Sequence, residues 1–229
     1  MTLRLQREIE RLKSKILEVG ALVEQSIRMA VVAIDEIDEA AAQKVMTEDA
    51  FIDEIEVMVE EECQKILSLH QPVAHDLRLI VSVMKINNDL ERMGDLAVNV
   101  CERALFLTTK ARIAPPFNLS DMGSEVQSMV KKCLDSLVHE DAILARQVIT
   151  RDDVIDEMNR KNYAAAIAEM KGDSKRIARL MHYVSVSSQL ERIADLATNI
   201  AEDVIYLVEG EIVRHKARIA AESEADESD

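Results

Sequence analysis

The feature that most constrains this chain is an internal repeat. The segment LERMGDLAVN, which begins at Leu90, returns as LERIADLATN from Leu190, at an offset of 100 residues. An upstream set returns at an offset of 103: Gly20, Val23, Thr47, Asp49, Ile52, Asp53 and Glu54 match Gly123, Val126, Thr150, Asp152, Ile155, Asp156 and Glu157. Because both sets occur twice in the same order, the chain is predicted to contain two similar units in tandem.

The spacing of apolar residues predicts that both units are helical. Between Leu5 and Ile37 apolar residues recur every three or four positions, which indicates one long amphipathic helix. Similar patterns predict helices over about 41–69 and 72–112, with a break at Pro72. The 229 residues include only 5 Gly and 3 Pro, so tight turns are few. The predicted fold is all-α, with two tandem pseudo-symmetric three-helix bundles.

The boundary between the bundles is predicted at the Pro115-Pro116 pair, which ends any helix. The first bundle is expected over 1–113, a linker over 114–118, the second bundle over 119–217 and an acidic flexible tail over 218–229. Ser120 or Asp121 is expected to cap the helix after the linker. Weaker helix breaks are predicted near 139–141 and 171–174.

Charge and hydropathy exclude several classes of protein. A net charge of −15 argues against nucleic-acid binding, which depends on Lys and Arg at phosphates. The N-terminus lacks the apolar region of a signal peptide, and no apolar run approaches the ~20 residues of a spanning helix. A cytoplasmic protein without membrane insertion is expected, with its three cysteines as buried free thiols.

Carboxylates in the repeated segments are candidate metal ligands. Glu91, Asp95 and Asn99 are spaced i, i+4 and i+8, so they share one helix face. Asp49 and Asp53 form an i, i+4 pair on the preceding helix, and the two pairs can converge if those helices are neighbours. Such a site offers only oxygen, which suits Mg²⁺, Mn²⁺ or iron.

Two other interpretations of these carboxylates stay open. Acidic residues at this spacing usually face solvent without a ligand, although their repetition in both units favours a function. Alternatively they serve helix pairing, because Arg92 and Arg192 also recur and Arg92 lies three residues before Asp95. Glu56 and Glu60 correspond to Asn159 and Tyr163 in the second unit, so metal binding is expected to be weaker there.

Motifs of common enzymes are absent from the sequence. It has no ExxH pair of a di-iron oxidase, no P-loop, no GxGxxG and no GxSxG. The sequence therefore gives no reason to expect catalysis.

The doubled LERxxDLAxN pattern, with DxxxD on the helix before it, resembles the PhoU family of phosphate-transport regulators. The resemblance covers roughly residues 3–215 and is most specific over 76–95. It implies multinuclear metal clusters on E(D)xxxD motifs, with iron or zinc favoured and Mn or Mg as further candidates. The ligands that it implies are Asp49, Asp53, Glu91, Asp95, Asn99, Asp152, Asp156, Glu191, Asp195 and Asn199.

The resemblance also implies a function. It implies a non-enzymatic homodimer that represses phosphate uptake and phosphate-starvation signalling, and that links the phosphate ABC transporter to a sensor histidine kinase. Such a protein would lie at the inner membrane through its protein partners. The alternatives are a metal-storage or metal-dependent helical-bundle protein, and a metal-free helical scaffold.

Overall fold

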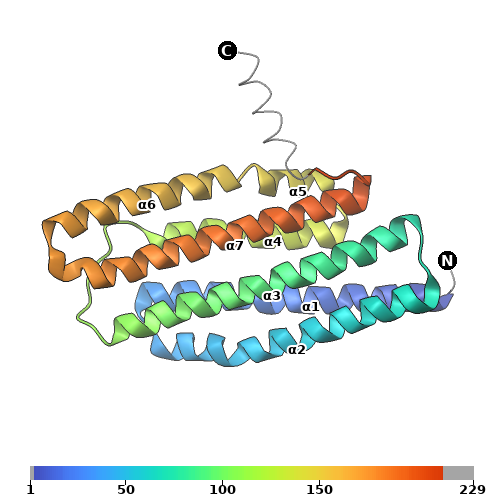
Figure 1. Cartoon of the computed structure of the whole chain (residues 1–229), viewed down its shortest axis with the longest axis horizontal. Helices are drawn as coiled ribbons and strands as arrows, with labels where there is room; N and C mark the ends of the chain where they lie inside the picture. The colour runs from blue at the N-terminus through green and yellow to red at the C-terminus, as the bar shows by residue number, and fades with distance from the viewer. Residues whose placement is uncertain (1–2, 214–229) are drawn as a thin grey trace, which may run out of the picture.

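The computed structural model describes residues 3–213, and within them the chain is helical without strands (Figure 1). The helices are α1 (Leu3–Glu36), α2 (Glu39–His70), α3 (Ala74–Thr108), α4 (Leu119–His139), α5 (Ala142–Ile149), α6 (Asp152–Gly172) and α7 (Ile177–Glu209), with a 3-10 turn, η1 (Ser174–Arg176), before α7. The first three helices form one bundle and the last four form the other. The predicted all-α fold with two tandem three-helix bundles is confirmed.

The middle helix of the second bundle is broken at a point that the sequence did not predict. Its counterpart α2 is continuous, whereas α5 ends and α6 begins around Thr150 and Arg151. The backbone tightens there, because Arg151 N donates to Val148 O at 3.0 Å. The Arg151 guanidinium pairs with Glu125 of α4 at 2.8 Å, which attaches the break to the neighbouring helix. The predicted breaks at 139–141 and 171–174 are present.

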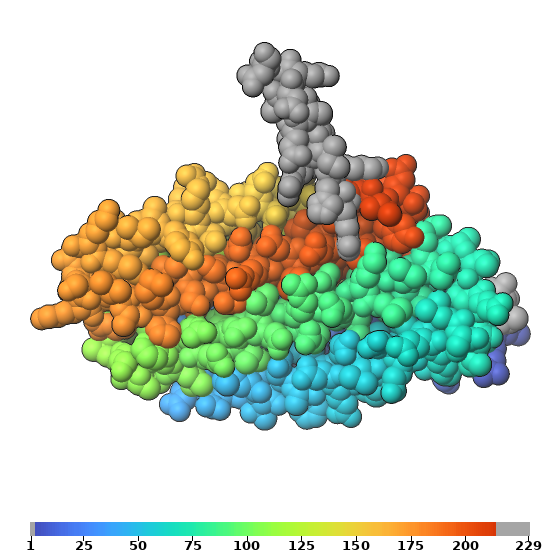
Figure 2. Space-filling model, in the orientation of Figure 1, coloured from blue at the N-terminus to red at the C-terminus, as the bar shows by residue number. Residues whose placement is uncertain are grey.

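Two long helices form the centre of the molecule. α3 and α7 make the most extensive contact between elements, α2 packs on α3, and α6 packs on α7. In Figure 2 the side chains of α3, in green, meet those of α7, in orange, along the middle of the visible face. Helix α2 lies on one side of this junction, and α5 and α6 lie on the other. Helices α1 and α4 contact each other behind α3 and α7 in the view of Figure 1. One hydrophobic core runs through both bundles, and Cys63, Cys101 and Cys133 are buried free thiols, as predicted.

The contact between α1 and α4 shows the relation between the bundles most clearly. A Cβ atom added to Gly20 would lie 2.7 Å from Leu134 Cδ2, and one added to Gly123 would lie 2.6 Å from Val31 Cγ1. Positions 20 and 123, and positions 31 and 134, are related by the same offset of 103 that the sequence shows. Each bundle therefore places a glycine under a branched side chain of the other, which lets the two helices approach closely.

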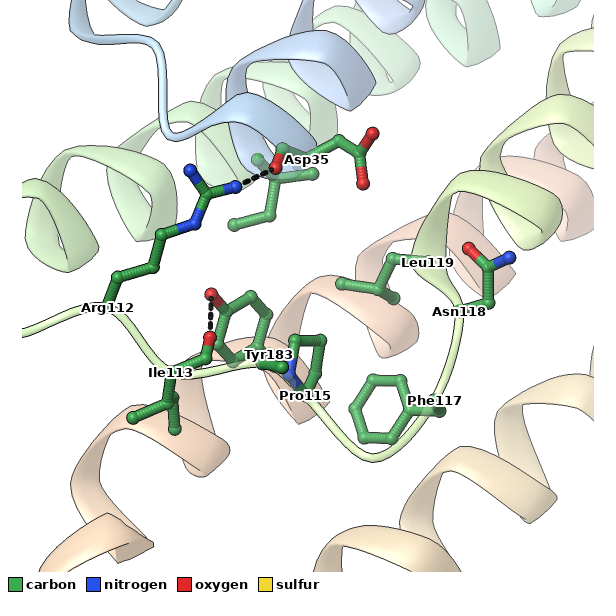
Figure 3. A pocket seen from close by; sticks show the side chains of 10 residues that line it. Asp35, Arg112, Ile113, Pro115, Phe117, Asn118, Leu119 and Tyr183 are labelled. Carbon is green, nitrogen blue, oxygen red and sulfur yellow. Dashed lines mark hydrogen bonds between the residues drawn. The ribbon is translucent and has the colours of Figure 1, made fainter.

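The connection between α3 and α4, residues 109–118, is attached to both bundles. Arg112 Nη2 donates to the carbonyl oxygen of Asp35 at 3.0 Å, and the Tyr183 hydroxyl donates to the carbonyl oxygen of Ile113 at 3.3 Å (Figure 3). The linker and its neighbours enclose a hollow of about 580 Å³. The cap of α4 is Asn118, whose side chain accepts from Ser120 N and Asp121 N, so neither of the two expected residues caps the helix. The expected acidic tail, 218–229, lies outside the described residues, as do residues 214–217.

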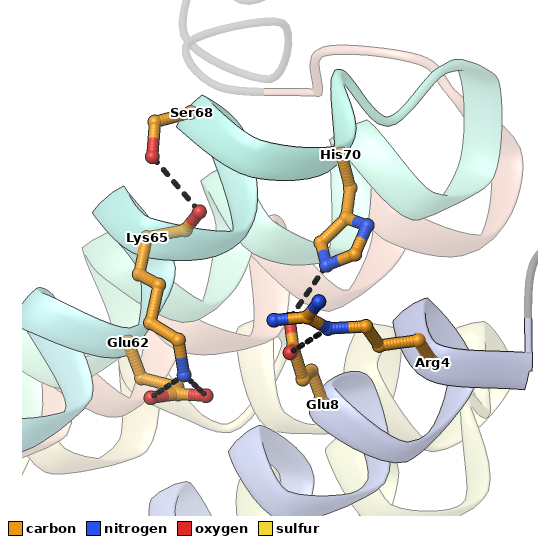
Figure 4. Close-up of polar contacts among 6 residues, drawn as sticks. All are labelled: Arg4, Glu8, Glu62, Lys65, Ser68 and His70. Carbon is orange, nitrogen blue, oxygen red and sulfur yellow. Dashed lines mark hydrogen bonds and ion pairs between the residues drawn. The ribbon is translucent and has the colours of Figure 1, made fainter.

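A buried contact between a carboxylate and an imidazole closes the opposite end of the first bundle (Figure 4). Glu8 is only 7% exposed, and its Oε2 lies 2.7 Å from His70 Nε2 at the end of α2. Arg4 Nε contacts Glu8 Oε1 at 3.3 Å. Burial acts to raise the pKa of Glu8, but the bonds to His70 and Arg4 outweigh it and hold this pKa below its ordinary value.

We expect His70→Ala to lower the melting temperature by a few degrees at pH 7, because Glu8 loses a partner while staying buried. A lowered carboxyl pKa contributes stability above the ordinary value of 4.5, and this contribution is lost as the pH falls through the lowered pKa. The deficit of the variant should therefore shrink in strong acid. Calorimetry against pH measures it, with His139→Ala, at an exposed residue, as the control. Equal deficits at pH 7 and pH 3 would contradict this account.

Candidate metal-binding faces

The first carboxylate face lies where α2 packs against α3. A Cβ atom on Gly94 would lie 3.1 Å from Asp49 Oδ1 and 3.3 Å from Ile52 Cδ1, so the two helices approach closely at this point. The glycine brings the half-buried Asp49 beside the turn of α3 that carries Glu91 and Asp95.

The carboxylates of α2 and α3 lie close enough for the charge of each to affect the pKa of the others. Burial, together with the charges of Asp53 and Asp95, raises the pKa of Asp49 to about 6. Burial, Asp95 and Asp53 also raise the pKa of Glu91. The shifts join α2 to α3, because each helix contributes charges that act on the other. A cation placed among these groups would relieve the repulsion.

The second face repeats this arrangement between α6 and α7. One carboxylate oxygen from each of Asp152, Asp156 and Asp195 lies within 4.8 Å of the others. Burial, Asp195 and Asp156 raise the pKa of Asp152 to about 6. The pKa values of Glu191 and Asp195 are raised first by burial and then by neighbouring carboxylates.

The donor set of the second face fits a divalent cation. Asp152 Oδ1 is buried and has no hydrogen-bond partner, which is costly for a carboxylate oxygen unless something positive approaches it. All three converging donors are carboxylate oxygens, which Mg²⁺, Mn²⁺ and iron accept and which zinc also uses. Asp152, Asp156 and Asp195 would hold such an ion, and it would join α6 to α7.

Charge and geometry favour different faces. The first face has Glu56, whose pKa is raised by burial and by nearby carboxylates, and the second face has Asn159 instead, which accepts a hydrogen bond from Ser187 at 2.7 Å. This difference supports the expectation of weaker binding at the second face. Within the described part of the chain, however, the converging set of three oxygens is found only at the second face. The converging oxygens therefore favour the second face as the site of a single ion. The larger number of carboxylates favours the first face as the site of a cluster of several ions.

A groove between α3 and α7 connects the two faces. It measures about 410 Å³ and is lined by the same four positions of each repeat: Arg92, Asp95, Leu96 and Asn99 of α3, and Arg192, Asp195, Leu196 and Asn199 of α7. Asn99 and Asn199, which the family resemblance implies as metal ligands, therefore line this groove. Asp95 and Asp195 line the groove and also belong to the carboxylate faces. The i, i+3, i+4, i+7 spacing of these residues was visible in the sequence, but their meeting across two helices was not.

The repeated arginines do not form the ion pair that the sequence suggested. Arg92 Nη1 lies 3.3 Å from Asp89 Oδ1, one turn before it, and the expected pair with Asp95 is not formed. Both Asp89 and Asp95 lie three positions from Arg92, so spacing alone could not distinguish them.

We expect Asp49→Asn to raise the melting temperature by a few degrees at pH 7.5 in the presence of a chelator. The pKa of Asp49 is raised from 3.8 to about 6, so its contribution to stability is present below 3.8 and lost as the pH rises through about 6. The neutral amide removes that loss, and the gain should disappear near pH 4. Thermal unfolding at both pH values measures it, with Glu10→Gln, at an exposed residue of α1, as the control. If the variant melted at a lower temperature than the parent at pH 7.5, burial and the neighbouring charges would not be destabilising the Asp49 carboxylate.

The fold and the faces define a class of protein: a duplicated all-α chain with a carboxylate face on each half. A family model described as the PhoU domain matches residues 16–104 and again residues 119–204. The chain belongs to the PhoU family, as its resemblance predicted. No described helix combines the length and apolarity needed to cross a membrane.

Named relatives and solved structures agree with this assignment. The "Phosphate-specific transport system accessory protein PhoU homolog" of Aquifex aeolicus is 38% identical over 214 residues, covering 93% of this chain and 97% of the relative. The protein of the same name from Pseudomonas aeruginosa is 39% identical over 209 residues, covering 91% and 86%. The crystal structure of PhoU from Pseudomonas aeruginosa superposes with a TM-score of 0.88 at 38% identity, covering 90% of this chain and 99% of that one.

Proposed function

We propose that this chain is a negative regulator of phosphate uptake and phosphate-starvation signalling. The observation that carries the proposal is the match of both halves to one family, with relatives named as accessory proteins of the phosphate-specific transport system. The chain would act without catalysis, as an adaptor that links the phosphate ABC transporter to a sensor histidine kinase. It would do so in the cytoplasm, as a homodimer held at the membrane by these partners.

Metal binding is the second part of the proposal. The converging oxygens of Asp152, Asp156 and Asp195, and the raised pKa of Asp49, support cation sites on both faces. Each cation would tie the middle helix of a bundle to α3 or α7 and so stiffen the surface that meets a partner. Clusters of iron or zinc are the form that the family resemblance favours, and Mn or Mg also suit the oxygen donors.

Complementation tests the regulatory role. A bacterium whose own family member has been deleted should express the phosphate-starvation reporter constitutively, and this chain should restore repression in phosphate-rich medium. Reporter activity and phosphate uptake are measured together, and pull-down from membranes tests contact with the transporter and the kinase. A folded, normally expressed chain that leaves the reporter active would contradict the proposal.

Variants separate the two alternative functions from the adaptor. A metal-storage protein should bind metal, but it should not restore repression of the starvation reporter in the deletion strain. A metal-free scaffold should repress equally well with both carboxylate faces removed. The faces lie at the helix surfaces, with Asp53, Asp95, Asp156 and Asp195 exposed, which favours contact with a partner over enclosed storage.

A further inference from the structure

We propose that the groove between α3 and α7 binds inorganic phosphate, with Arg92 and Arg192 as its cationic ligands. This inference rests on the proposed role in phosphate regulation and deepens it, because it makes the chain itself a phosphate sensor. The groove adjoins the carboxylate faces and shares Asp95, Asn99, Asp195 and Asn199 with them, but its arginines belong to neither set of candidate metal ligands.

The groove presents hydrogen-bond donors from both halves of the chain. Each repeat contributes one guanidinium and one side-chain amide, from Arg92 and Asn99 on α3 and from Arg192 and Asn199 on α7. A guanidinium offers paired N–H groups in the geometry that two phosphate oxygens accept, and an amide can complete the set. The volume of about 410 Å³ admits a phosphate ion together with water.

The arginines are not needed to hold the helices together. Arg192 makes no hydrogen bond or ion pair with any residue between 3 and 213, and its charge acts to lower the pKa values of Glu191 and Asp195 on its own helix. Arg92 pairs within its own helix, with Asp89, and its side chain stays 57% exposed. The second repeat has Gln189 in place of Asp89, so Arg192 lacks the carboxylate that its counterpart has. The guanidinium of Arg192 therefore has N–H groups available for an anion in the groove, and the exposed guanidinium of Arg92 has N–H groups beyond the one that contacts Asp89.

The lining charge predicts when phosphate binds. Two guanidinium groups face two carboxylates, so the groove is neutral in the absence of cations. Cations held at Asp95 and Asp195 would offset the carboxylates and leave the arginines in excess. We therefore expect phosphate binding to depend on metal, which would couple the two faces to the groove that lies between them.

Equilibrium dialysis of the full chain against radiolabelled phosphate tests the inference, in manganese chloride and in EDTA. The parent chain should bind one phosphate in manganese and little in EDTA. Arg192→Gln should weaken binding about tenfold, the loss of one charged hydrogen-bond partner, and Arg92→Gln with Arg192→Gln should abolish it. Arg28→Gln, at an exposed residue of α1, is the matched control and should bind like the parent. Bound manganese is measured in each sample and should be unchanged by the arginine substitutions.

Three outcomes would overturn the inference: no binding by the manganese-loaded parent at millimolar phosphate, equal binding by Arg192→Gln, or equal competition by sulfate, which would indicate a general anion site. Its failure is separable from that of the proposed function. A chain that represses the starvation reporter without binding phosphate leaves the regulatory role intact, whereas a chain that binds phosphate without repressing overturns the role alone.

Discussion

Metal content should fall to nearly zero when two carboxylates of each face are changed to Ala, namely Glu91, Asp95, Glu191 and Asp195. These side chains come from α3 and α7, and without them the aspartates of α2 and α6 lack their partners across the helix contact. Metal ions bound by carboxylates need several oxygens at once, so losing half of each set should remove most of the affinity. Elemental analysis of protein purified without chelator measures the effect.

A charge-matched variant controls for the lost acids. Glu10, Glu18, Glu36 and Glu61 are exposed, and changing these four to Ala removes the same charge away from both faces. This control should keep its metal. In chelator the face variant should be at least as stable as the parent, because the repulsion that raises the pKa of Asp49 and Asp152 is reduced.

The two possible results have different consequences. Several ions in the parent, lost in the face variant and kept in the control, would establish the faces as metal sites. Absence of metal from all three would mean that the repeated carboxylates serve helix pairing or partner docking. Membership of the family would stand in either case, because it rests on the match of both halves.

Gly123→Ala should destabilise the chain by up to about 2 kcal/mol, although Ala is the better helix former. The new methyl group would lie 2.6 Å from Val31 Cγ1 and 2.8 Å from Val31 Cγ2. Valine has little χ1 freedom in a helix, so α1 and α4 must move apart, and such overpacking costs about 1–3 kcal/mol. The gain in helix propensity, about 1 kcal/mol, is subtracted from this cost, and the approach below 3 Å places the cost toward the upper part of its range. Urea unfolding measures the difference.

Two further variants make this prediction specific to the contact between the bundles. Gly172→Ala should be neutral or slightly stabilising, since no heavy atom lies within 4 Å of the added Cβ. In a Val31→Ala background, Gly123→Ala should cost much less, because the methyl groups that it meets are gone. Additive effects of the two substitutions would contradict the described contact.

Sequence was sufficient for the fold because the repeat and the helical spacing are local signals. The same spacing placed Glu91 and Asp95 on one face, and their nearness to Asp49 required only that adjacent helices pack together. The break at Arg151 could not be predicted, because it involves an ion pair with Glu125 on another helix.

Contacts between distant segments were likewise hidden. The pair of Glu8 and His70 joins residues 62 positions apart, and neither belongs to a motif. The groove depends on how α3 crosses α7, and the sequence showed its residues only as two separate sets. The contact of neighbouring helices in sequence, α2 with α3, was therefore predicted, whereas contacts between helices far apart in the sequence were not.

The shared core has a consequence for how this duplicated chain unfolds and evolves. The apolar faces of α1 and α4, and of α3 and α7, cover one another, so each half separated at the linker would expose them to water. The two repeats should consequently melt in one cooperative transition, and fragments made by cutting at the prolines should be poorly soluble alone. Selection for stability then acts on both repeats together. The residues on the two carboxylate faces can differ between the repeats, as Glu56 and Asn159 do, while the shared core is kept.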